Sequence, residues 1–405
     1  MELIADLHIH SRFSRACSSK ITIANLEKNA RIKGIDVLGT GDFQHPKWFQ
    51  ELNTLEERDG ILYTKTGYPF VWQSEISLIY TQDGKGRKVH QVVLAPNKDA
   101  VKEITEFLLS KGRIDYDGRP IFGMSSIEFV ERLKSISTDI EIIPAHIWTP
   151  WFSLFGSNSG FDSIKDCFQD QLKHIHALET GMSSDPEMNW RISQLDKFNL
   201  VSFSDMHSMY PWRMGREATL FDIDLTYKNL IRAIRTKKGY NGTIEVDPNY
   251  GKYHVDGHRN CNVVMDPEET KKHNNICPVC KKPLTIGVLS RVQELADRGE
   301  GYKPKDYTKY KTLIPLGELI SMHLKKGIAT KSVSEILDRM FNRFGSEFNI
   351  LLNVEKKDLD KEVGEKLAEI IIRNRSGEIE VKPGYDGVYG IPQLEVKKNK
   401  SLTGF

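Results

Sequence analysis

The sequence is poor in cysteine. Only five cysteines occur in 405 residues, and three of them lie within residues 261–280. A small scaffold held by disulfides carries many cysteines in pairs along a short chain, so this distribution excludes that class of secreted protein. Three clustered cysteines fit a metal site better.

Long hydrophobic runs are also missing. No stretch approaches the roughly 20 apolar residues that span a bilayer. Met1 leads directly into a strand-like segment that carries Asp6 and His8, and no apolar leader precedes it. We therefore expect a soluble, cytoplasmic protein.

The charge is nearly balanced overall but unevenly distributed. The net charge is +2, yet residues 1–227 carry 25 basic and 31 acidic side chains, whereas residues 228–405 carry 32 basic and 24 acidic ones. A basic second half is expected of a segment that binds phosphates, although an ordinary lysine-rich surface has the same composition. The chain length suggests two or three domains.

Histidines and acidic residues recur after apolar, strand-like runs. The first run leads into His8 and His10, and helix-like stretches at Ile23–Lys33, Lys98–Ser110 and Ser126–Lys134 separate later runs. Such alternation favours a parallel sheet, in which strand carboxyl ends converge on one edge. The later runs carry Asp42 and His45, Glu75, His90, His146, and Asp205 with His207.

Imidazole and carboxylate are the ligands that zinc, manganese and iron share. One carboxylate can bridge two ions, so this set can hold two or three metals. Ions ~3.5–4 Å apart stabilise the attacking and leaving oxygens of a phosphoryl transfer. The pattern therefore predicts hydrolysis of a phosphoester by divalent ions, with zinc expected and manganese or magnesium as alternatives.

The same residues resemble those of the PHP (polymerase and histidinol phosphatase) superfamily over roughly residues 1–227. The resemblance implies an α/β fold, a distorted β/α barrel of seven strands that holds up to three metals. It implies one metal on His8, His10, Glu75 and Asp205, a second on Glu75, His90 and His146, and a third near His207. Asp205, Glu75, His8 and His10 would be catalytic.

The third site departs from the superfamily pattern. Ala16 and Phe43 stand where the superfamily has metal ligands. We expect Asp42 and His45 to substitute for them.

Two short knuckles predict a structural zinc. Fifteen residues separate the pair His258 and Cys261 from the pair Cys277 and Cys280, a spacing that places four ligands around a tetrahedral ion. His258 fits the first knuckle best, with His254 and His273 as alternatives. Four protein ligands leave no open position, so the ion should be structural.

This zinc-ribbon-like segment and the basic, mainly helical region after it resemble the endonuclease Q family of DNA-repair nucleases, including Tyr253–Cys261 and Cys277–Cys280. The resemblance implies lesion-containing double- or single-stranded DNA as partner and location at the nucleoid. It also implies cleavage 5′ of an extruded uracil, hypoxanthine, xanthine or abasic site. The alternative is a small-molecule phosphatase of the histidinol-phosphate type.

Two segments beside the expected metal ligands are candidates for DNA contact. The first is an aromatic loop after His146, and the second follows His207. The loop could instead pack down on the barrel. Their candidate residues are Trp148, Trp151, Phe152 and Asn158, and Tyr210, Arg213 and Arg216. Glu179, which ends another strand-like run, could support the site.

We expect four regions along the chain. They are a catalytic barrel at 1–227, a zinc-binding module with linkers at 228–300, a helical DNA-binding region at 301–396 and a basic tail at 397–405. Apolar spacing predicts helices at Ser332–Phe344 and Lys361–Arg373 in the third region. The tail resembles a sliding-clamp-binding box.

Overall fold

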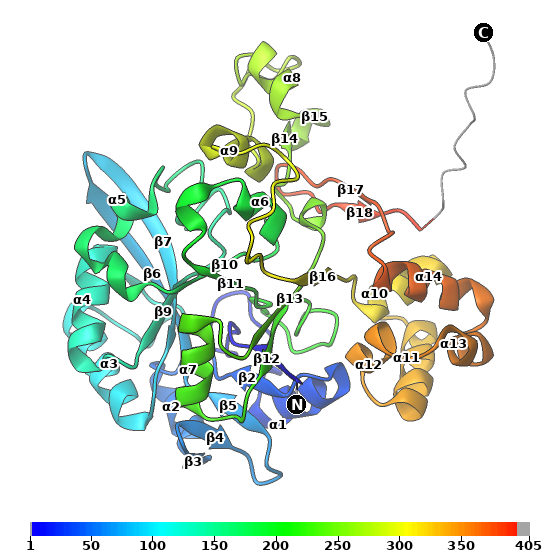
Figure 1. Ribbon diagram of the computed structural model, residues 1–405, viewed down its shortest axis with the longest axis horizontal. Helices are drawn as coiled ribbons and strands as arrows, with labels where there is room; N and C mark the ends of the chain where they lie inside the picture. Colours follow the sequence, from blue (N-terminus) through cyan, green and yellow to red (C-terminus); the bar gives the residue numbers. More distant parts are fainter. Residues whose placement is uncertain (1, 395–405) are drawn as a thin grey trace.

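A computed structural model describes residues 2–394 of the chain. Its mixed α/β architecture, followed by a zinc-ribbon-like module and a helical region, confirms the expected fold class (Figure 1). The expected clamp-binding segment at 399–405 lies outside the described residues.

The largest sheet runs through the first 312 residues in the order β16-β13-β12-β1-β2-β5-β4-β3. Its strands are β1 (Glu2–Asp6), β2 (Val37–Gly39), β3 (Glu56–Arg58), β4 (Ile61–Tyr63), β5 (Pro69–Val71), β12 (Ala218–Asp222), β13 (Tyr240–Glu245) and β16 (Tyr310–Thr312).

A four-stranded sheet, ordered β8-β6-β7-β9, and three two-stranded sheets complete the described strands. The four strands are β6 (Gln73–Gln82), β7 (Lys85–Leu94), β8 (Ile121–Phe122) and β9 (Glu141–Pro144). The pairs are β10 (Ala177–Glu179) with β11 (Asn199–Val201), β14 (Asp256–His258) with β15 (Val263–Met265), and β17 (Val381–Lys382) with β18 (Ile391–Pro392).

The α-helices cover these sheets and form the helical region. They are α1 (Ile23–Lys33), α2 (Pro46–Leu52), α3 (Lys98–Lys111), α4 (Ser126–Ile136), α5 (Ile164–Phe168), α6 (Pro186–Trp190), α7 (Tyr227–Thr236), α8 (Pro267–Lys272), α9 (Val288–Leu295), α10 (Leu316–Leu324), α11 (Lys331–Phe344), α12 (Glu347–Leu352), α13 (Lys356–Val363) and α14 (Glu365–Arg375).

Local capping explains why three helices lie where the sequence predicts them. The side chains of Thr22, Asn97 and Ser125 accept hydrogen bonds from main-chain N–H groups in the first turns of α1, α3 and α4. Gly34 ends α1 in the left-handed conformation. The predicted helix Lys361–Arg373 is divided, because Gly364 adopts φ 79° between α13 and α14.

The expectation of a parallel sheet is confirmed only for some strand pairs, because the sheets are mixed. β2 pairs parallel with both β1 and β5, and β10 with β11. β1 pairs antiparallel with β12, and β7 pairs antiparallel with both β6 and β9. Asp83 and Gly84 join β6 to β7 with positive φ at both residues, the geometry of a tight two-residue hairpin. An Asp-Gly pair between two apolar runs is the hairpin signal that the sequence interpretation overlooked.

A closed seven-stranded barrel is not confirmed, because strand pairing leaves separate sheets. Isolated main-chain hydrogen bonds connect their ends: Ala95 donates to Trp72, Ile147 to Glu179, and His10 to Met206. These contacts bring the ends of β1, β7, β9 and β11 around one centre.

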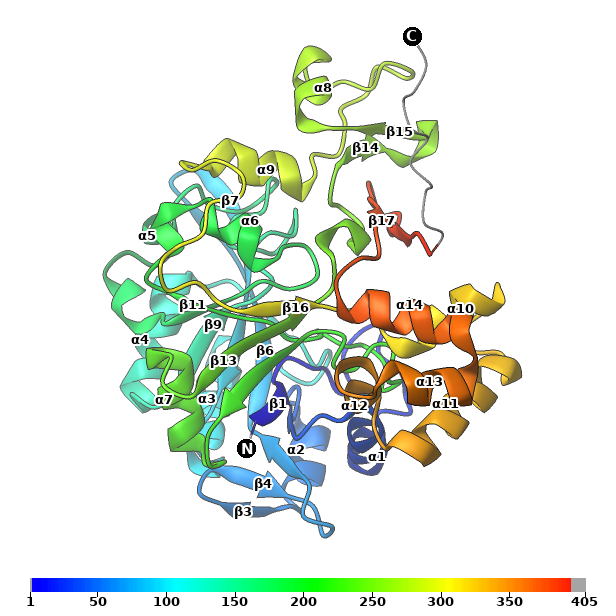
Figure 2. The same ribbon diagram turned by 45° about the vertical axis from the view of Figure 1, so that its right-hand side comes forward.

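The expected boundary after residue 227 passes through the main sheet. β13 and β16 both lie beyond that residue and pair within the sheet that contains β1. We call residues 2–245 the N-terminal part, residues 256–285 the zinc module and residues 316–375 the helical part. Figure 2 shows the zinc module, with α8, β14 and β15, standing apart from the other two.

The N-terminal and helical parts share one apolar core. Leu26 and Ala30 of α1 belong to the same buried cluster as Phe348 of α12 and Ile371 of α14. The zinc module has a separate cluster of only Met265, Cys277 and Leu284. Its fold therefore has little hydrophobic support of its own. No helix within residues 2–394 has the length and apolar content that crossing a membrane requires.

A buried ion pair connects α1 to α12. Lys33 Nζ lies 2.6 Å from Glu347 Oε1, with both side chains 1% exposed. Lys33 also donates to the Pro211 carbonyl oxygen at 2.9 Å, and Glu347 Oε1 accepts from Leu316 N. The pair therefore ties the helical part to the loop that follows Asp205.

Lys33→Met is expected to lower the free energy of unfolding by about 3–5 kcal/mol, because it leaves the Glu347 carboxylate buried without its partner. Urea unfolding measures this loss. The double variant Lys33→Met/Glu347→Gln should recover most of it. A single variant as stable as the parent would show that the pair contributes nothing.

Candidate metal centre and cavity

Four side chains that the sequence singled out converge on one point. Ligand atoms of His8, His10, Glu75 and Asp205 all lie within 4.8 Å of one another. His10 Nε2 is 3.2 Å from Glu75 Oε2 and 3.0 Å from Asp205 Oδ1. The residues follow β1, lie in β6 and follow β11, so the cluster forms only when these three elements meet.

A second cluster shares Glu75. His90 Nδ1 lies 2.6 Å, and His146 Nε2 lies 3.1 Å, from Glu75 Oε1. Glu75 therefore presents Oε2 to the first cluster and Oε1 to the second. This is the geometry of a carboxylate that bridges two ions.

The environment of His8 fits a metal ligand. Its Nδ1 lies 2.9 Å from Glu179 Oε1, while its buried Nε2 has no hydrogen-bond partner among the described residues. That nitrogen is 3.6 Å from Glu75 Oε2 and 3.7 Å from Asp205 Oδ1. A carboxylate behind an imidazole whose other nitrogen faces a ligand cluster is the usual arrangement at metal sites. Nitrogen and oxygen donors in this number suit a divalent ion.

Asp42 contacts His10 in the same way as Glu179 contacts His8. Its Oδ1 lies 3.2 Å from His10 Nδ1, and its Oδ2 accepts hydrogen bonds from Ser11 and Ser14. Asp42 is thus engaged behind the first cluster and belongs to neither group of converging ligands.

The structure does not assemble the expected third metal site from the described residues. His45 stacks on Phe13 with ring centroids 4.3 Å apart. His207 Nδ1 is 3.7 Å from Asp205 Oδ1, but His207 joins neither ligand cluster. Phe43, where the superfamily has a ligand, is fully buried in the core.

Charges within the clusters oppose desolvation, and they outweigh it at Glu75 and His8 but not at His90. Burial disfavours the ionised form of Glu75, yet His90, Arg119 and His8 hold its pKa well below the usual value. Burial likewise disfavours protonated His8, but Glu179 and Glu75 raise its pKa well above the usual value. Burial lowers the pKa of His90 to about 4, which keeps the imidazole neutral as a ligand must be.

The backbone is strained at the same residues. Asp42, His146 and Asp205 adopt φ values of 43°, 31° and 45°, which residues with a Cβ rarely occupy. Such strain persists where surrounding structure enforces it, and it concentrates at functional sites. It aims the side chains that follow β2, β9 and β11 toward the centre.

The sequence analysis missed Arg119, whereas it suggested that Glu179 supports the site. Arg119 Nη1 lies 3.1 Å from Glu75 Oε2. It belongs to a loop before β8 and follows no apolar run, so no local signal marks it. Glu179 ends β10, and the structure places it against His8 as that position suggested.

A cavity of about 550 Å³ opens in front of both clusters. Arg213 and Arg216 line it, as do Trp151 and Phe152 of the aromatic loop. Segments distant in sequence complete the wall: Lys252 and Tyr253 before the zinc module, and Tyr389 between β17 and β18.

The other predicted DNA-contact residues lie away from this cavity. Trp148 is fully buried, and its Nε1 donates to Asn189 Oδ1 at 2.8 Å, so it packs the loop against the core. Tyr210 stacks on Trp212 at 4.7 Å. Asn158 is exposed but does not line the cavity. Of the aromatic loop, Trp151 is the exposed member at the mouth, 41% exposed.

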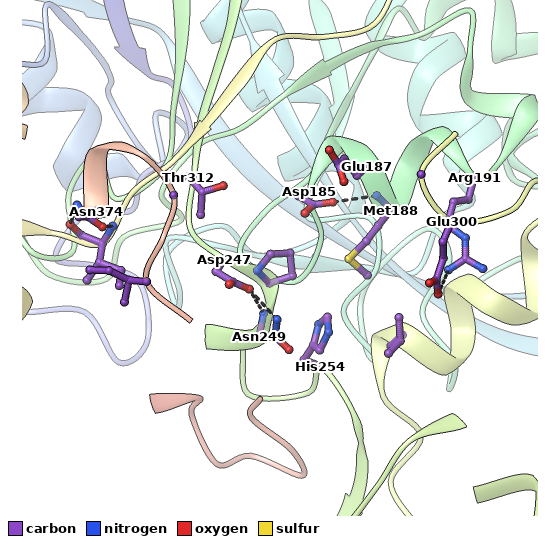
Figure 3. A pocket seen from close by; sticks show the side chains of 16 residues that line it. Asp185, Glu187, Met188, Arg191, Asp247, Asn249, His254, Glu300, Thr312 and Asn374 are labelled. Atoms are coloured by element: carbon purple, nitrogen blue, oxygen red, sulfur yellow. Dashed lines mark hydrogen bonds and ion pairs between the residues drawn. The ribbon is translucent and has the colours of Figure 1, made fainter. Parts of the chain in front are cut away.

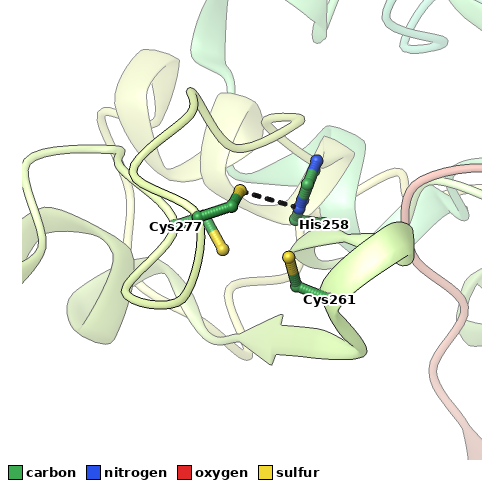
Figure 4. A group of neighbouring side chains, drawn as sticks. His258, Cys261 and Cys277 are labelled. Atoms are coloured by element: carbon green, nitrogen blue, oxygen red, sulfur yellow. Dashed lines mark hydrogen bonds between the residues drawn. The ribbon is translucent and has the colours of Figure 1, made fainter.

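The four predicted zinc ligands come together in the zinc module (Figure 4). Ligand atoms of His258, Cys261, Cys277 and Cys280 lie within 4.8 Å of one another, and His258 Nδ1 is 3.4 Å from Cys280 Sγ. Desolvation opposes ionisation of Cys277, but N–H groups of Cys280 and Val279 lower its pKa to about 7. The alternatives His254 and His273 are not in this group.

A buried acid behind the site should make stability depend on pH. Burial raises the pKa of Glu217 to about 8, against the Ser202 hydroxyl and the Val246 N–H that hydrogen-bond to it. The folded protein thus holds a proton that the unfolded chain releases near pH 4.5. The contribution of Glu217 to the free energy of unfolding is fully present below about pH 4.5. It is lost as the pH rises to about 8, by at most about 1.4 kcal/mol per pH unit.

Glu217→Gln should remove the part of that dependence that Glu217 contributes, whereas the neighbouring Glu245, whose pKa burial and Glu217 also raise, keeps its own part. Urea unfolding of both proteins from pH 5 to 8 should show the variant gaining stability relative to the parent as pH rises. A constant difference between the two would contradict the assignment.

Comparisons with known proteins cover both the helical part and the whole chain. The family model described as the MJ0043 C-terminal domain matches residues 315–378. An uncharacterised Methanocaldococcus jannaschii protein, MJ0043, is 37% identical over 249 residues, which are 60% of this chain and 31% of that protein. The chain thus corresponds to about a third of this relative. An uncharacterised Bacillus subtilis protein, YqxK, is 29% identical over 96% of this chain and 98% of its own.

Two solved structures match over nearly the full length. One is the lesion-specific endonuclease PfuEndoQ from Pyrococcus furiosus, with 32% identity, a TM-score of 0.87 and 98% of each chain covered. The other is an endonuclease Q complex with a 27-mer duplex that carries an abasic lesion at the active site. It has the same identity and TM-score, with 98% of this chain and 99% of that chain covered.

Proposed function

The chain belongs to the endonuclease Q family of DNA-repair endonucleases, and from that membership we propose that it hydrolyses the phosphodiester on the 5′ side of a deaminated base or abasic site. The observation that carries the proposal is Glu75, which joins two ligand clusters at the base of a cavity lined by arginine and aromatic side chains.

We propose that His8, His10, Glu75 and Asp205 hold one divalent ion, and that Glu75, His90 and His146 hold another. Ions at these positions would supply an activated water and neutralise charge on the phosphate. The protein fixes the ligands beforehand: Glu179 and Asp42 engage the Nδ1 atoms of His8 and His10, so both Nε2 atoms face Glu75.

The cavity wall fits a DNA strand with a displaced nucleotide. Arg213 and Arg216 present guanidinium groups that pair with phosphates. Trp151 meets Tyr253 edge to face, with centroids 5.3 Å apart, and together they offer apolar surface on which a base can stack. The displaced nucleotide then occupies the space between these rings and the ligand clusters. Attack at phosphorus with departure of the 3′ oxygen leaves 3′-hydroxyl and 5′-phosphate ends.

To discriminate deaminated bases from normal ones, the site needs a hydrogen-bond donor that faces the carbonyl shared by uracil, hypoxanthine and xanthine. Facing the amino group of a normal base, such a donor would stay unpaired at a cost of about 1–3 kcal/mol. Ser157 and Asn158 are poor candidates, because neither lines the cavity. Ser183 and Ser208 do line it, and we propose that the donor lies among such wall residues.

The decisive experiment is incubation with duplexes that carry uracil, hypoxanthine, an abasic site or no lesion, with the product ends mapped. We expect a nick 5′ of each lesion, intact undamaged duplex, and a rate that falls steeply with salt because phosphate contacts release counterions. Turnover of small phosphate esters that ignores salt, without nicking, would instead indicate a phosphatase.

A further inference from the structure

A second cavity, of about 410 Å³, lies between the N-terminal part, the helical part and the segments that connect the zinc module to them (Figure 3). Its walls come from α6, from residues 247–249 and His254, from Leu289 of α9, and from β16 and the end of α14. None of its lining residues belongs to either catalytic ligand cluster or to the zinc cluster. The proposed nuclease reaction does not use it.

The cavity concentrates negative charge. Asp185 and Asp247 line its interior, where each also accepts main-chain hydrogen bonds, from Met188 N and Asn249 N respectively. Glu187 and Glu300 lie further out, and Arg191 is engaged by Glu300 at 3.4 Å. Burial, reinforced by neighbouring acids, raises the pKa of Asp185 to about 6, which shows that its charge is poorly compensated.

His254 is an independent sign that the cavity accepts a ligand. The residue is 7% exposed, and its Nδ1 has no hydrogen-bond partner among residues 2–394. Figure 3 shows its ring standing among the lining side chains beside Asn249. Burial lowers its pKa to about 4, so the ring is neutral near pH 7 and cannot balance the carboxylates. A buried polar nitrogen without a partner is costly, and a ligand N–H would satisfy it.

The rest of the lining is apolar and selects the kind of cation. Met188, Leu289, Ile314 and Ile379 contribute aliphatic surface to the same cavity wall as the acids. A bare divalent ion fits poorly, because within the described chain no three histidine or carboxylate ligand atoms of this cavity converge to 4.8 Å. A wall that offers both carboxylates and hydrocarbon matches a chain of methylenes that carries amino groups.

We propose that this cavity binds a linear aliphatic polyamine. Its ammonium groups pair with Asp185 and Asp247, its methylenes lie against Met188 and Leu289, and an N–H donates to His254. The segment that carries Asp247 and His254 also carries Lys252 and Tyr253, which line the catalytic cavity. A ligand in this cavity touches the N-terminal part, the helical part and the segments on either side of the zinc module, and therefore stabilises their arrangement by mass action.

The test is calorimetric titration and thermal unfolding of the full-length, zinc-loaded protein at pH 7.5 without DNA. The probes are spermidine, putrescine, magnesium chloride and sodium chloride at matched ionic strength. Spermidine should bind saturably at one site and raise Tm. Asp247→Asn and Asp185→Asn keep their capping hydrogen bonds but remove a charge, so they should weaken binding about tenfold or more. His254→Phe should also weaken it.

Asp99→Asn provides the matched control, since it removes the same charge from an exposed site on α3. It should bind spermidine as the parent does. The proposal is overturned if sodium chloride reproduces the stabilisation, if magnesium binds saturably while the amines do not, or if the three cavity variants bind spermidine unchanged. Loss of nuclease activity has no bearing on these readouts, so the two proposals fail separately.

Discussion

Glu75→Gln is expected to lower lesion-dependent cleavage on the order of 10³-fold or more, the largest effect of any single change in the site. Glutamine keeps the shape of the side chain but replaces one carboxylate oxygen with an N–H₂ donor, which cannot ligate an ion. Because Glu75 faces His10 through Oε2 and His90 through Oε1, one substitution damages both clusters.

Two measurements should report this loss together. Single-turnover nicking of a uracil duplex gives the rate, and elemental analysis gives the metal content, which should fall to the structural zinc alone. Glu141→Gln is the matched control, because Glu141 is also a fully buried glutamate but pairs with Arg235 and His176 away from the clusters. Unchanged rate and metal content in Glu75→Gln would refute the bridging assignment.

We propose that His258, Cys261, Cys277 and Cys280 hold a structural zinc, and removal of this ion should unfold the zinc module while the rest of the chain stays folded. Structural zinc contributes an apparent ~10–16 kcal/mol in zinc-finger peptides at pH 7. The three-residue apolar cluster of the module cannot replace that contribution. Cys277→Ser changes one ligand that is also the most buried side chain of that cluster, so we expect loss of zinc and rapid proteolysis within residues 256–285.

Unfolding of the zinc module should also alter the wall of the catalytic cavity. Asp386, between β17 and β18, accepts hydrogen bonds from Arg259 N at 2.6 Å and Thr285 Oγ1 at 2.7 Å. Unfolding of the module removes these two contacts, while main-chain hydrogen bonds from Gly384, Gly387 and Gly390 to residues 249–252 remain. The segment that carries Tyr389 thus loses part of its support, so DNA binding should weaken although both ligand clusters of the catalytic cavity remain. Cys17→Ser, which changes a cysteine outside the module, should leave zinc and protease resistance intact. Full zinc retention in Cys277→Ser would contradict the ligand assignment.

The helices and the ligand types were predictable because their signals are local. Thr22 and Gly34 bound α1 through contacts within a few residues, and the zinc knuckles bring paired ligands within one turn of chain. The Asp83-Gly84 hairpin was equally local and was overlooked, so the error in strand direction was one of interpretation.

The roles within the site could not be predicted in the same way. Asp42 resembles a metal ligand in sequence, but Ser11, Ser14 and His10 occupy its oxygens and place it behind the cluster. Arg119 has no sequence signal, yet it touches Glu75. Each of these facts depends on which distant segment fills the space next to a side chain.

The sequence by itself determined which reactive side chains are available: nitrogen and oxygen ligands after apolar runs, four predicted zinc ligands in two knuckles, and basic charge in the second half. Only the tertiary structure decided that Glu75 serves two clusters, that Trp148 is buried while Trp151 is exposed, and that Lys252, Tyr253 and Tyr389 complete the cavity. The reason is physical. Residue type and short-range spacing set what a side chain can bind, whereas its actual partners depend on packing between segments that are far apart in sequence, 314 residues for Lys33 and Glu347.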